Sequence, residues 1–397
     1  MNRLVGVTSR GIRAPIIKQG DDLAQIVTDC VLQASKSEGF ELHDKDVVAV
    51  TESVVARSQG NYAKTDAIGK DVRAKLGGGT VGVLFPILSR NRFSHILEGI
   101  AKGCGKVVIA LSYPSDEVGN HLFSEETLDE SGVDPFNDVL SLAKYREIFG
   151  YPKHPFTGMD YVEYYEKIVK EAGSQAEIIF TNQAKAILDY TDTVICADIH
   201  TRFRNKRRLE KLGARKVITL SDLLTASVDG SGYNAQYGLL GSNISRKGEV
   251  KLFPREDKAL VYAIQSNIFN KTGKRVEVMV YGDGAFKDPQ GEIWELADPV
   301  VSPFFTDGLL GTPNEIKLKY LADNNYDSLR GEAALNAIKR EIARKDADLV
   351  GKMASQGTTP RQITDLLGSL CDLTSGSGDK GTPIVLVQGY FDNLAND

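Results

Sequence analysis

The feature that most constrains the fold is a regular alternation of short apolar runs and helical segments between about residues 61 and 235. The apolar runs have the length of buried strands, and the segments between them repeat apolar residues at helical spacing. Strands that alternate with helices form crossover units, which assemble into a mostly parallel sheet. The predicted strands are Val81–Leu88, Lys106–Leu111, Glu177–Thr181, Thr193–Ala197 and Lys216–Leu220, and the predicted helices are Arg92–Lys102, Tyr161–Ala172, Gln183–Leu188 and Asn205–Leu212.

The two ends of the chain have a different sequence pattern, in which predicted helices and strands are separated by glycine-rich turns. Asp21 or Asp22 can cap a helix that runs to about Ser37, because aspartate is strongly preferred at helix N-caps. The run Thr51–Arg57 is consistent with the start of a helix or with a second strand. Further predicted elements are the strands Asp46–Thr51, Arg275–Tyr281 and Pro383–Val387 and the helices Lys258–Asn270, Glu332–Lys345 and Thr359–Leu373.

This change of sequence pattern near residues 60 and 236 predicts two domains in an α/β fold. Residues 1–60 and 236–397 form one discontinuous α+β core domain, and residues 61–235 form an inserted parallel α/β unit. A chain of 397 residues is longer than one hydrophobic core usually serves, which agrees with two domains.

Composition narrows the class of partner. The net charge of −5 gives no basic footprint for nucleic acid, and no apolar stretch approaches the roughly 20 residues that span a bilayer. The four cysteines are scattered, without a CxxC pair, as expected of reduced thiols in a cytoplasm. We therefore expect a cytoplasmic protein that binds neither nucleic acid nor a membrane.

Glycine-punctuated segments at both ends of the chain predict an anion-binding site. They are Gly11–Leu23, Asp46–Gly60, Gly238–Asn243 and Thr374–Gly389. Glycine lets backbone N–H groups approach a ligand closely, and successive N–H groups can hold a phosphate. The loop Gly376–Gly381 adds Lys380 as a point charge, although the same loop could be an ordinary turn between a helix and a strand. No GxxxxGK[ST] motif is present, which excludes an ordinary P-loop.

Asp283 is the candidate metal ligand. It follows an apolar run, at the carboxyl end of a predicted strand, where ligand-facing residues gather in α/β sheets. Between two glycines it could hold Mg²⁺ or Mn²⁺, with water and phosphate oxygens completing the shell, or it could be a turn aspartate. The five histidines have no HxxxH or HExxH spacing, so a zinc site is not predicted.

At these segments the chain resembles the coenzyme F-420:L-glutamate ligase family, the GTP-dependent γ-glutamyl ligases, as an enlarged, bacterial-type member. GIRAPIIKQGDDLA is similar to the family's opening nucleotide loop, and DVVAVTESVVARSQG to its next strand and turn. GLLGSN, TGKRVEVMVYGDGAFKDP and GSGDKGTPIVLVQG then follow in the family's order. The resemblance covers both ends, about half of the chain, and not the middle region.

The resemblance implies an amide-forming ligase that adds L-glutamate, or a similar amino acid, to a carboxylate acceptor through an acyl phosphate. It implies GTP or another nucleoside triphosphate, Mg²⁺ or Mn²⁺, a small-molecule acceptor and a homodimer. Asp283 and Arg57 are the implied catalytic residues, and Asp283 with Gly284 occupies the metal position. The implied nucleotide-binding residues are Gly11, Ile12, Arg13, Ala14, Pro15, Ile16, Glu52, Ser53, Arg57, Asn243, Gly376, Ser377, Gly378, Asp379, Lys380 and Gly381.

Two departures from the family pattern leave alternatives open. The family's metal-binding aspartate falls on Leu240, and the acidic residue of the final loop falls on Ser377. Asp198, Glu52 or Asp116 could replace the lost ligands. Alternatively, the chain is a nucleotide-binding protein of the same fold that has lost or changed the ligase reaction. An oxidoreductase built on the middle unit is disfavoured, because that unit lacks GxGxxG in a strand–turn–helix context.

Overall fold

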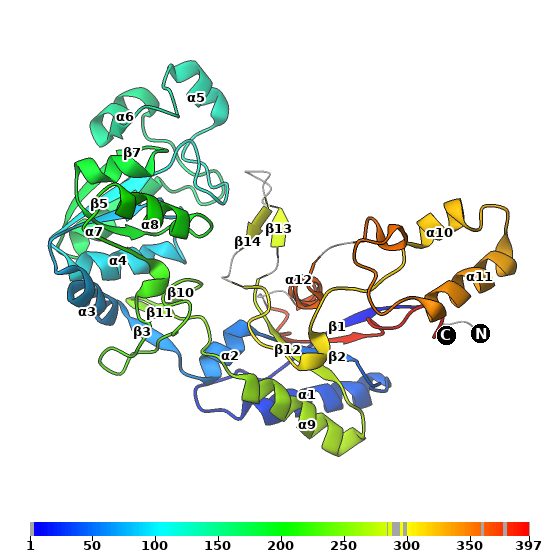
Figure 1. Cartoon of the computed structure of the whole chain (residues 1–397). Coiled ribbons are helices and arrows are strands. Elements are labelled where there is room, and N and C mark those ends of the chain that lie inside the picture. The colour runs from blue at the N-terminus through cyan, green and yellow to red at the C-terminus, as the bar shows by residue number, and fades with distance from the viewer. Residues whose placement is uncertain are drawn as a thin grey trace.

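The computed structural model describes residues 4–283, 285–287, 294–296, 300–358, 361–375 and 379–396. It confirms the predicted α/β class, because two large mixed sheets are each covered by helices. Figure 1 shows these sheets in separate parts of the molecule, one at the upper left and one at the lower centre.

The first sheet is formed by the two ends of the chain. In spatial order its strands are β1 (Thr8–Ile12), β15 (Ile384–Gln388), β2 (Val47–Thr51) and β12 (Glu277–Tyr281). β12 is parallel to β2, whereas β15 is antiparallel to both of its neighbours. The first and last strands of the chain are therefore direct neighbours.

Side chains alternate between the two faces of this sheet, as the pleat requires. Val48 and Val50 of β2 pack on one face with α1 (Leu23–Glu38) and α9 (Lys258–Thr272). The intervening Val47 and Ala49 pack on the other face with α12 (Ile363–Ser375). Asp22 caps α1, with its side chain accepting from the Gln25 N–H, and this settles the choice between Asp21 and Asp22.

The second sheet contains the predicted β/α alternation. Its strands, in spatial order, are β6 (Leu140–Ser141), β7 (Gln175–Phe180), β5 (Lys106–Leu111), β4 (Thr80–Leu84), β8 (Thr193–Cys196) and β9 (Lys216–Thr219). All are parallel except β6. The chain fills the sheet from β4 outward through β5 and β7, then returns to the other side of β4 with β8 and β9. This is a doubly wound order, with its topological switch between β4 and β8.

Helices cover both faces of this second sheet. One face packs against α3 (Thr65–Leu76), α4 (Phe93–Gly103) and α7 (Tyr161–Glu171), and the other against α8 (Arg202–Lys211) and the 3₁₀ segment η1 (Ala184–Asp189). The smaller helices α5 (Glu125–Ser131) and α6 (Leu142–Phe149) precede α7.

Two predicted elements differ from the structure. The strand predicted to reach Leu88 ends at Leu84, because Phe85 adopts a positive φ of 52° and Pro86 has no N–H to donate to a ladder. The helix predicted at 183–188 is the 3₁₀ segment η1. The segment after β2, for which a helix or a strand was predicted, is the helix α2 (Glu52–Ser58).

A small third sheet joins the two large ones. β3 (Tyr62–Lys64) pairs with β11 (Glu249–Lys251), which pairs with β10 (Asn243–Arg246). Leu239, Val250 and Leu252 pack in the same core as β4, although they follow residue 236. The exact domain boundaries stay a prediction, but this packing associates residues 239–252 with the second sheet.

The remaining elements lie beside the first sheet. The hairpin of β13 (Ala285–Lys287) and β14 (Trp294–Leu296) follows β12 and stands between the two large sheets in Figure 1. α10 (Leu318–Asn324) and α11 (Gly331–Arg344) extend from the first sheet on the side where both termini lie. Short 3₁₀ segments are η2 (Leu220–Asp222), η3 (Asp307–Leu309) and η4 (Met353–Ser355). Among the described helices, not one combines the length and the apolar character that a membrane crossing requires.

Candidate functional site

The predicted site segments that contain β1, β2, β12 and β15 meet at one edge of the first sheet. β2 and β12 end together, with Thr51 opposite Tyr281, and β15 begins beside them, with Ile384 opposite Val50. β1 ends at the same edge, because Ile12 lies opposite Ile384. Neighbouring strands are about 4.8 Å apart, so the ends of β1 and β12 are separated by roughly 14 Å. A nucleoside triphosphate is long enough to lie along such an edge.

The opening loop and the closing loop contact each other at this edge. The Ala14 N–H donates to the Gly381 carbonyl at 3.2 Å. A Cβ on Gly11 would lie 3.2 Å from Thr382, which explains why the smallest residue is found where the two segments approach. A cleft of about 990 Å³, here called the loop cleft, is lined by Arg10, Gly11, Ile12, Arg13, Cys30, Gln33, Ala34, Ser37, Glu38, Phe40, Lys380 and Thr382.

Four of the predicted nucleotide-binding residues, Gly11, Ile12, Arg13 and Lys380, therefore share one cleft. Arg13 and Lys380 are both exposed there. Arg10, which was not predicted, is held in place: its guanidinium donates to Gln388 Oε1 at 2.6 Å and lies 4.6 Å from the Phe40 ring centroid. Two exposed cations and a positioned third suit an anionic ligand.

The other predicted residues of the two loops are placed as follows. Pro15 and Ile16 are exposed, with 80% of Ile16 accessible, and Asp379 is exposed beside Lys380. Gly376, Ser377 and Gly378 lie outside the described residues. Ser375, the residue before them, lies beside Tyr281 at the end of β12. The described residues on either side of 376–378 therefore lie near β12 and near β1.

α2 contributes Arg57, Ser53 and Glu52. Arg57 Nε donates to the Ile17 carbonyl at 3.2 Å, so this exposed arginine touches the end of the opening loop. Ser53 is half-buried in the first turn. Glu52 is buried and accepts two bonds from Lys251 Nζ, at 2.9 and 3.2 Å. This pair gives Glu52 a partner within the protein, in addition to its predicted role in nucleotide binding.

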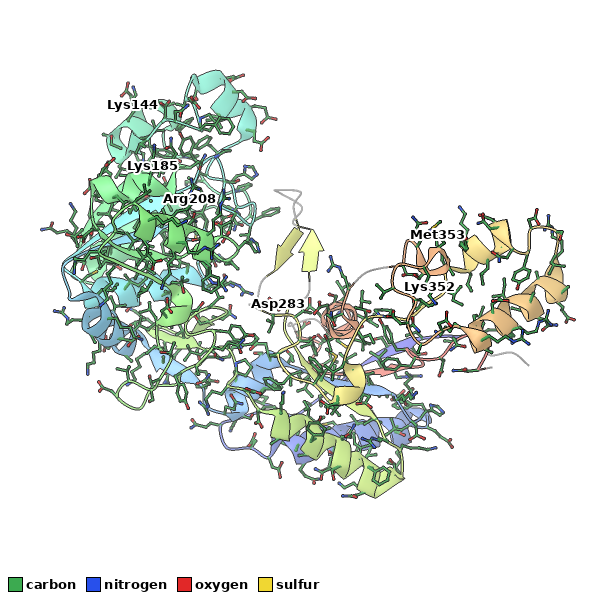
Figure 2. The ribbon with its side chains drawn as sticks, viewed as in Figure 1. Lys144, Lys185, Arg208, Asp283, Lys352 and Met353 are labelled. Carbon is green, nitrogen blue, oxygen red and sulfur yellow. The ribbon has the colours of Figure 1, made fainter. Side chains whose placement is uncertain are left out.

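Asp283 lies two residues beyond β12 and faces the second sheet. Its Oδ2 atom accepts from Arg92 Nη2 at 2.7 Å, and the Asp283 side chain is 44% exposed. Figure 2 shows Asp283 between the two large sheets, at the base of the β13–β14 hairpin. A cleft of about 460 Å³, here called the β4 cleft, is lined by Ile87, Leu88, Ser89, Arg90, Asn91, Arg92, Asn120, His154, Thr157, Tyr161 and Asp283.

Within the described residues, Asp283 and Lys380 line different clefts. Asn243 begins β10, next to Ile244, whose N–H donates to the Asn91 carbonyl at 2.7 Å. Asn91 lines the β4 cleft, so Asn243 is adjacent in sequence to a residue that contacts the wall of that cleft. Leu240 lies in an apolar cavity with Ile87 and Phe93.

The residues around Asp283 fit a divalent cation site with one protein carboxylate, in which phosphate and water oxygens supply the other ligands. Mg²⁺ is commonly bound through one or two carboxylates plus substrate phosphates and water, and the half-exposed Asp283 supplies one such carboxylate. In the part of the chain that the structure describes, no three acidic, histidine or cysteine side chains form a metal cluster. Gly284, the second predicted metal position, lies outside the described residues.

The three acidic residues suggested as replacement ligands all have other partners. Asp116 accepts from the Leu88, Val118 and Asn120 N–H groups, and Asp198 from the side chains of Thr201 and Asn205. Burial raises the pKa of both carboxyls. Glu52, the third, pairs with Lys251.

Besides Arg10, the functional candidates that the sequence analysis missed are Arg90, Arg92 and Glu117. Glu117 accepts from the Ile199 and His200 N–H groups, and burial raises its pKa to about 7. Arg92 could have been found from its position in a polar Arg-Asn-Arg segment after a predicted strand. Because the predicted strand ran to Leu88, four residues too far, the loop at its carboxyl end was predicted to be shorter than it is.

Comparison with known proteins agrees with these motifs. The family model described as F420-0:Gamma-glutamyl ligase matches residues 11–389, nearly the whole chain. No curated protein matches the sequence. Among solved structures, the biosynthetic arginine decarboxylase SpeA from Campylobacter jejuni is similar at 11% identity, over 90% of this chain and 67% of that one. Its TM-score of 0.13 is too low to carry an argument about fold or function.

Proposed function

The chain belongs to the F420-0:gamma-glutamyl ligase family, and from this membership we propose that it is a nucleotide-dependent ligase that joins L-glutamate, or a similar amino acid, to a carboxylate acceptor. The observation that carries the proposal is the family match across residues 11–389. The meeting of β1, β15, β2 and β12 at one edge supports it, because this edge brings together four of the five family-like segments, whereas GLLGSN packs with the second sheet.

The proposed reaction has two steps. An oxygen of the acceptor carboxylate attacks the γ-phosphorus of GTP, the bond from that phosphorus to the β–γ bridging oxygen breaks, and GDP leaves. The amine nitrogen of glutamate then attacks the acyl carbon of the acyl phosphate, inorganic phosphate leaves, and the nitrogen loses a proton. The first step brings two anions together, so positive charge and oriented N–H groups dominate its barrier.

The described residues supply positive charge around the opening loop. Arg13 and Lys380 in the loop cleft, with Arg57 beside the opening loop, are placed to bind the triphosphate. Asp283 would hold Mg²⁺ or Mn²⁺, which supplies Lewis-acid charge at phosphate oxygens when bound. Clamping the reactants at one edge also avoids a costly encounter of three molecules, an effect worth roughly 7–11 kcal/mol at best.

A titration calorimetry experiment tests this proposal. GTP and ATP are titrated into the protein with and without Mn²⁺, and one of them is expected to bind more tightly with the cation. Lys380→Ala and Arg57→Ala should each weaken nucleotide binding by about ten- to a hundredfold, since each removes a charge-assisted contact. Asp283→Asn should reduce only the gain in nucleotide affinity that Mn²⁺ provides. Lys185→Ala is the control, because Lys185 is exposed on η1 in the other part of the molecule (Figure 2).

The second candidate is a nucleotide-binding protein of the same fold without ligase activity. It is favoured by Leu240, which places an apolar, buried side chain where the family resemblance expects a metal-binding carboxylate. Glutamate-dependent release of inorganic phosphate from the bound nucleotide, with a mixture of small carboxylic acids as acceptors, separates the two. Nucleotide binding without release of phosphate would favour this second candidate. If neither GTP nor ATP binds, both candidate functions are refuted.

A further inference from the structure

The β4 cleft lies outside the carboxyl ends of β4 and its neighbour β5, beside the topological switch between β4 and β8. In such sheets, ligands occupy the crevice outside the carboxyl ends of the strands, next to the topological switch. β4 is the strand at which this sheet switches direction, and Leu88–Arg92 belong to the loop that follows it. Asn120 comes from the loop after β5, the neighbouring strand.

The loop after β4 is held rigidly by buried groups. The Tyr165 hydroxyl donates to the Ile87 carbonyl at 2.6 Å and accepts from the Ser89 N–H at 2.8 Å. The buried Asp116 carboxylate accepts from the Leu88 N–H at 2.7 Å. Phe85, at the start of the loop, has a positive φ of 52°, a strained conformation for a bulky residue that persists only where the surroundings enforce it. Preorganised loops of this kind lose little entropy when they bind a ligand.

The charge of the cleft is suited to an anion. Arg90 and Arg92 line it, and Asp283 is its acidic residue. Arg92 is paired with Asp283, whereas Arg90 is exposed and forms no ion pair within the described residues. The polar side chains of Asn120 and His154 complete the wall. An arginine guanidinium presents a planar set of donors that matches carboxylate or phosphate.

The cleft also adjoins the proposed nucleotide edge and an apolar cavity. Asp283 lies two residues beyond β12, so the cleft adjoins the edge of the first sheet. Ile87 and Arg92 line both the cleft and the apolar cavity that contains Leu240, so the two spaces are neighbours. A volume of about 460 Å³ is within the usual range for small-molecule sites.

We infer that the β4 cleft binds the acceptor, and that the acceptor is a small molecule with two anionic groups. One is the carboxylate that is joined to the amino acid, directed towards Asp283 and the nucleotide edge. The other is a carboxylate or phosphate held by Arg90. This inference rests on the proposed function, and it assigns acceptor recognition to the inserted sheet.

The test measures binding of three probe anions by ligand-observed NMR. The probes are 3-phosphoglycerate, with a phosphate and a carboxylate, glutarate, with two carboxylates, and butyrate, with one. At least one dianion is expected to bind at least about tenfold more tightly than butyrate, since a second charge-assisted contact is available to it. The tighter dianion shows whether Arg90 receives phosphate or carboxylate. Equal binding of all three probes, or no binding of either dianion, overturns the inference.

Arg90 variants test the assignment of the contact. Arg90→Ala should weaken dianion binding about tenfold or more and leave butyrate unchanged, and Arg90→Lys should recover part of the loss. Arg208→Ala removes the same charge from the exposed surface of α8 and should change nothing (Figure 2). Arg90 is exposed, so an unchanged thermal midpoint is expected and confirms folding. Dianion binding that is unaffected by Arg90→Ala refutes the inference.

Nucleotide titrations of the same proteins separate this inference from the proposed function. Arg90→Ala is expected to bind GTP and Mn²⁺ like the parent, because Arg90 faces the acceptor. If the parent binds dianions and no nucleotide, the proposed function fails, and with it the acceptor role, while the anion site stands. If nucleotide binds and the dianions do not, the cleft assignment alone fails. If Arg90→Ala weakens nucleotide binding instead, the cleft belongs to the nucleotide.

Discussion

The buried ion pair between Glu52 and Lys251 offers a quantitative test of how the two parts of the molecule are held together. Glu52 begins α2, directly after β2 of the first sheet, and Lys251 ends β11 of the small joining sheet. Their side chains are only 7% and 10% exposed, and Lys251 Nζ contacts both carboxylate oxygens. We predict that Lys251→Met is strongly destabilising.

The magnitude follows from the geometry. At 2.9 Å and an effective dielectric constant of about 20, the Coulomb attraction is about 6 kcal/mol. The cost of removing both charges from water offsets much of this attraction in the intact pair. Removing one partner leaves the other desolvated without compensation, so a loss of about 3–5 kcal/mol in the free energy of unfolding is expected. Replacing both, as Glu52→Leu with Lys251→Met, should recover much of that loss.

The assay is urea unfolding followed by far-ultraviolet circular dichroism, for the parent, both single variants and the double variant. The control is Lys170→Met, which breaks a 2.7 Å pair with Glu166 on α7, where the two side chains are 59% and 29% exposed. That variant should lose no more than about 0.5 kcal/mol. A change of similar size in Lys170→Met and Lys251→Met would show that burial does not set the strength of the Glu52–Lys251 pair, and the argument would fail.

Further predictions concern pH dependence, helix packing and assembly. The pKa of Glu117 is raised from 4.5 to about 7, chiefly by burial, so the folded state keeps a proton that the unfolded chain has lost between these values. Stability from this group therefore falls as pH rises from about 4.5 to 7, by at most on the order of 3 kcal/mol, and Glu117→Gln should flatten this slope in urea unfolding at several pH values. Gly103→Ala should lose about 1–3 kcal/mol, because its Cβ would lie 2.6 Å from the Gly69 carbonyl oxygen between α4 and α3. Gly79→Ala, with open space at the Cβ, is the matched control, and equal losses in thermal unfolding would refute the packing argument. Sedimentation should report about twice the 43.3 kDa chain mass if the homodimer implied by the family forms, and a monomer at micromolar concentration would contradict it.

Local chemistry made much of the fold predictable from the sequence. The strands β5 and β8 are continuous apolar runs, and their observed bounds nearly match the predicted ones. α1 begins after Asp22, a preferred N-cap, and ends at Gly39, whose positive φ of 68° suits glycine. The alternation of such elements predicted the parallel sheet, since the handedness and shortness of connections leave few other arrangements.

Errors arose where an apolar run did not reveal its backbone geometry. Residues 81–88 are almost all apolar, yet the strand stops at Leu84 because Phe85 turns the chain. Apolar periodicity reports burial, and residues of a packed loop are buried as well as residues of a strand. Arg90 and Arg92, at the polar end of this loop, were consequently not predicted as site residues.

The sequence by itself determined the elements, the α/β class and the motifs that associate the chain with its family, because these depend on neighbouring residues. Only the tertiary structure decided which side chains meet. Arg92 and Asp283 are 191 residues apart, and Glu52 and Lys251 are 199 apart, yet both pairs lie within 3 Å. No periodicity or local spacing encodes such contacts. They exist because the strand orders of two sheets bring distant chain segments to the same edge, where charged side chains find partners on leaving the buried strands.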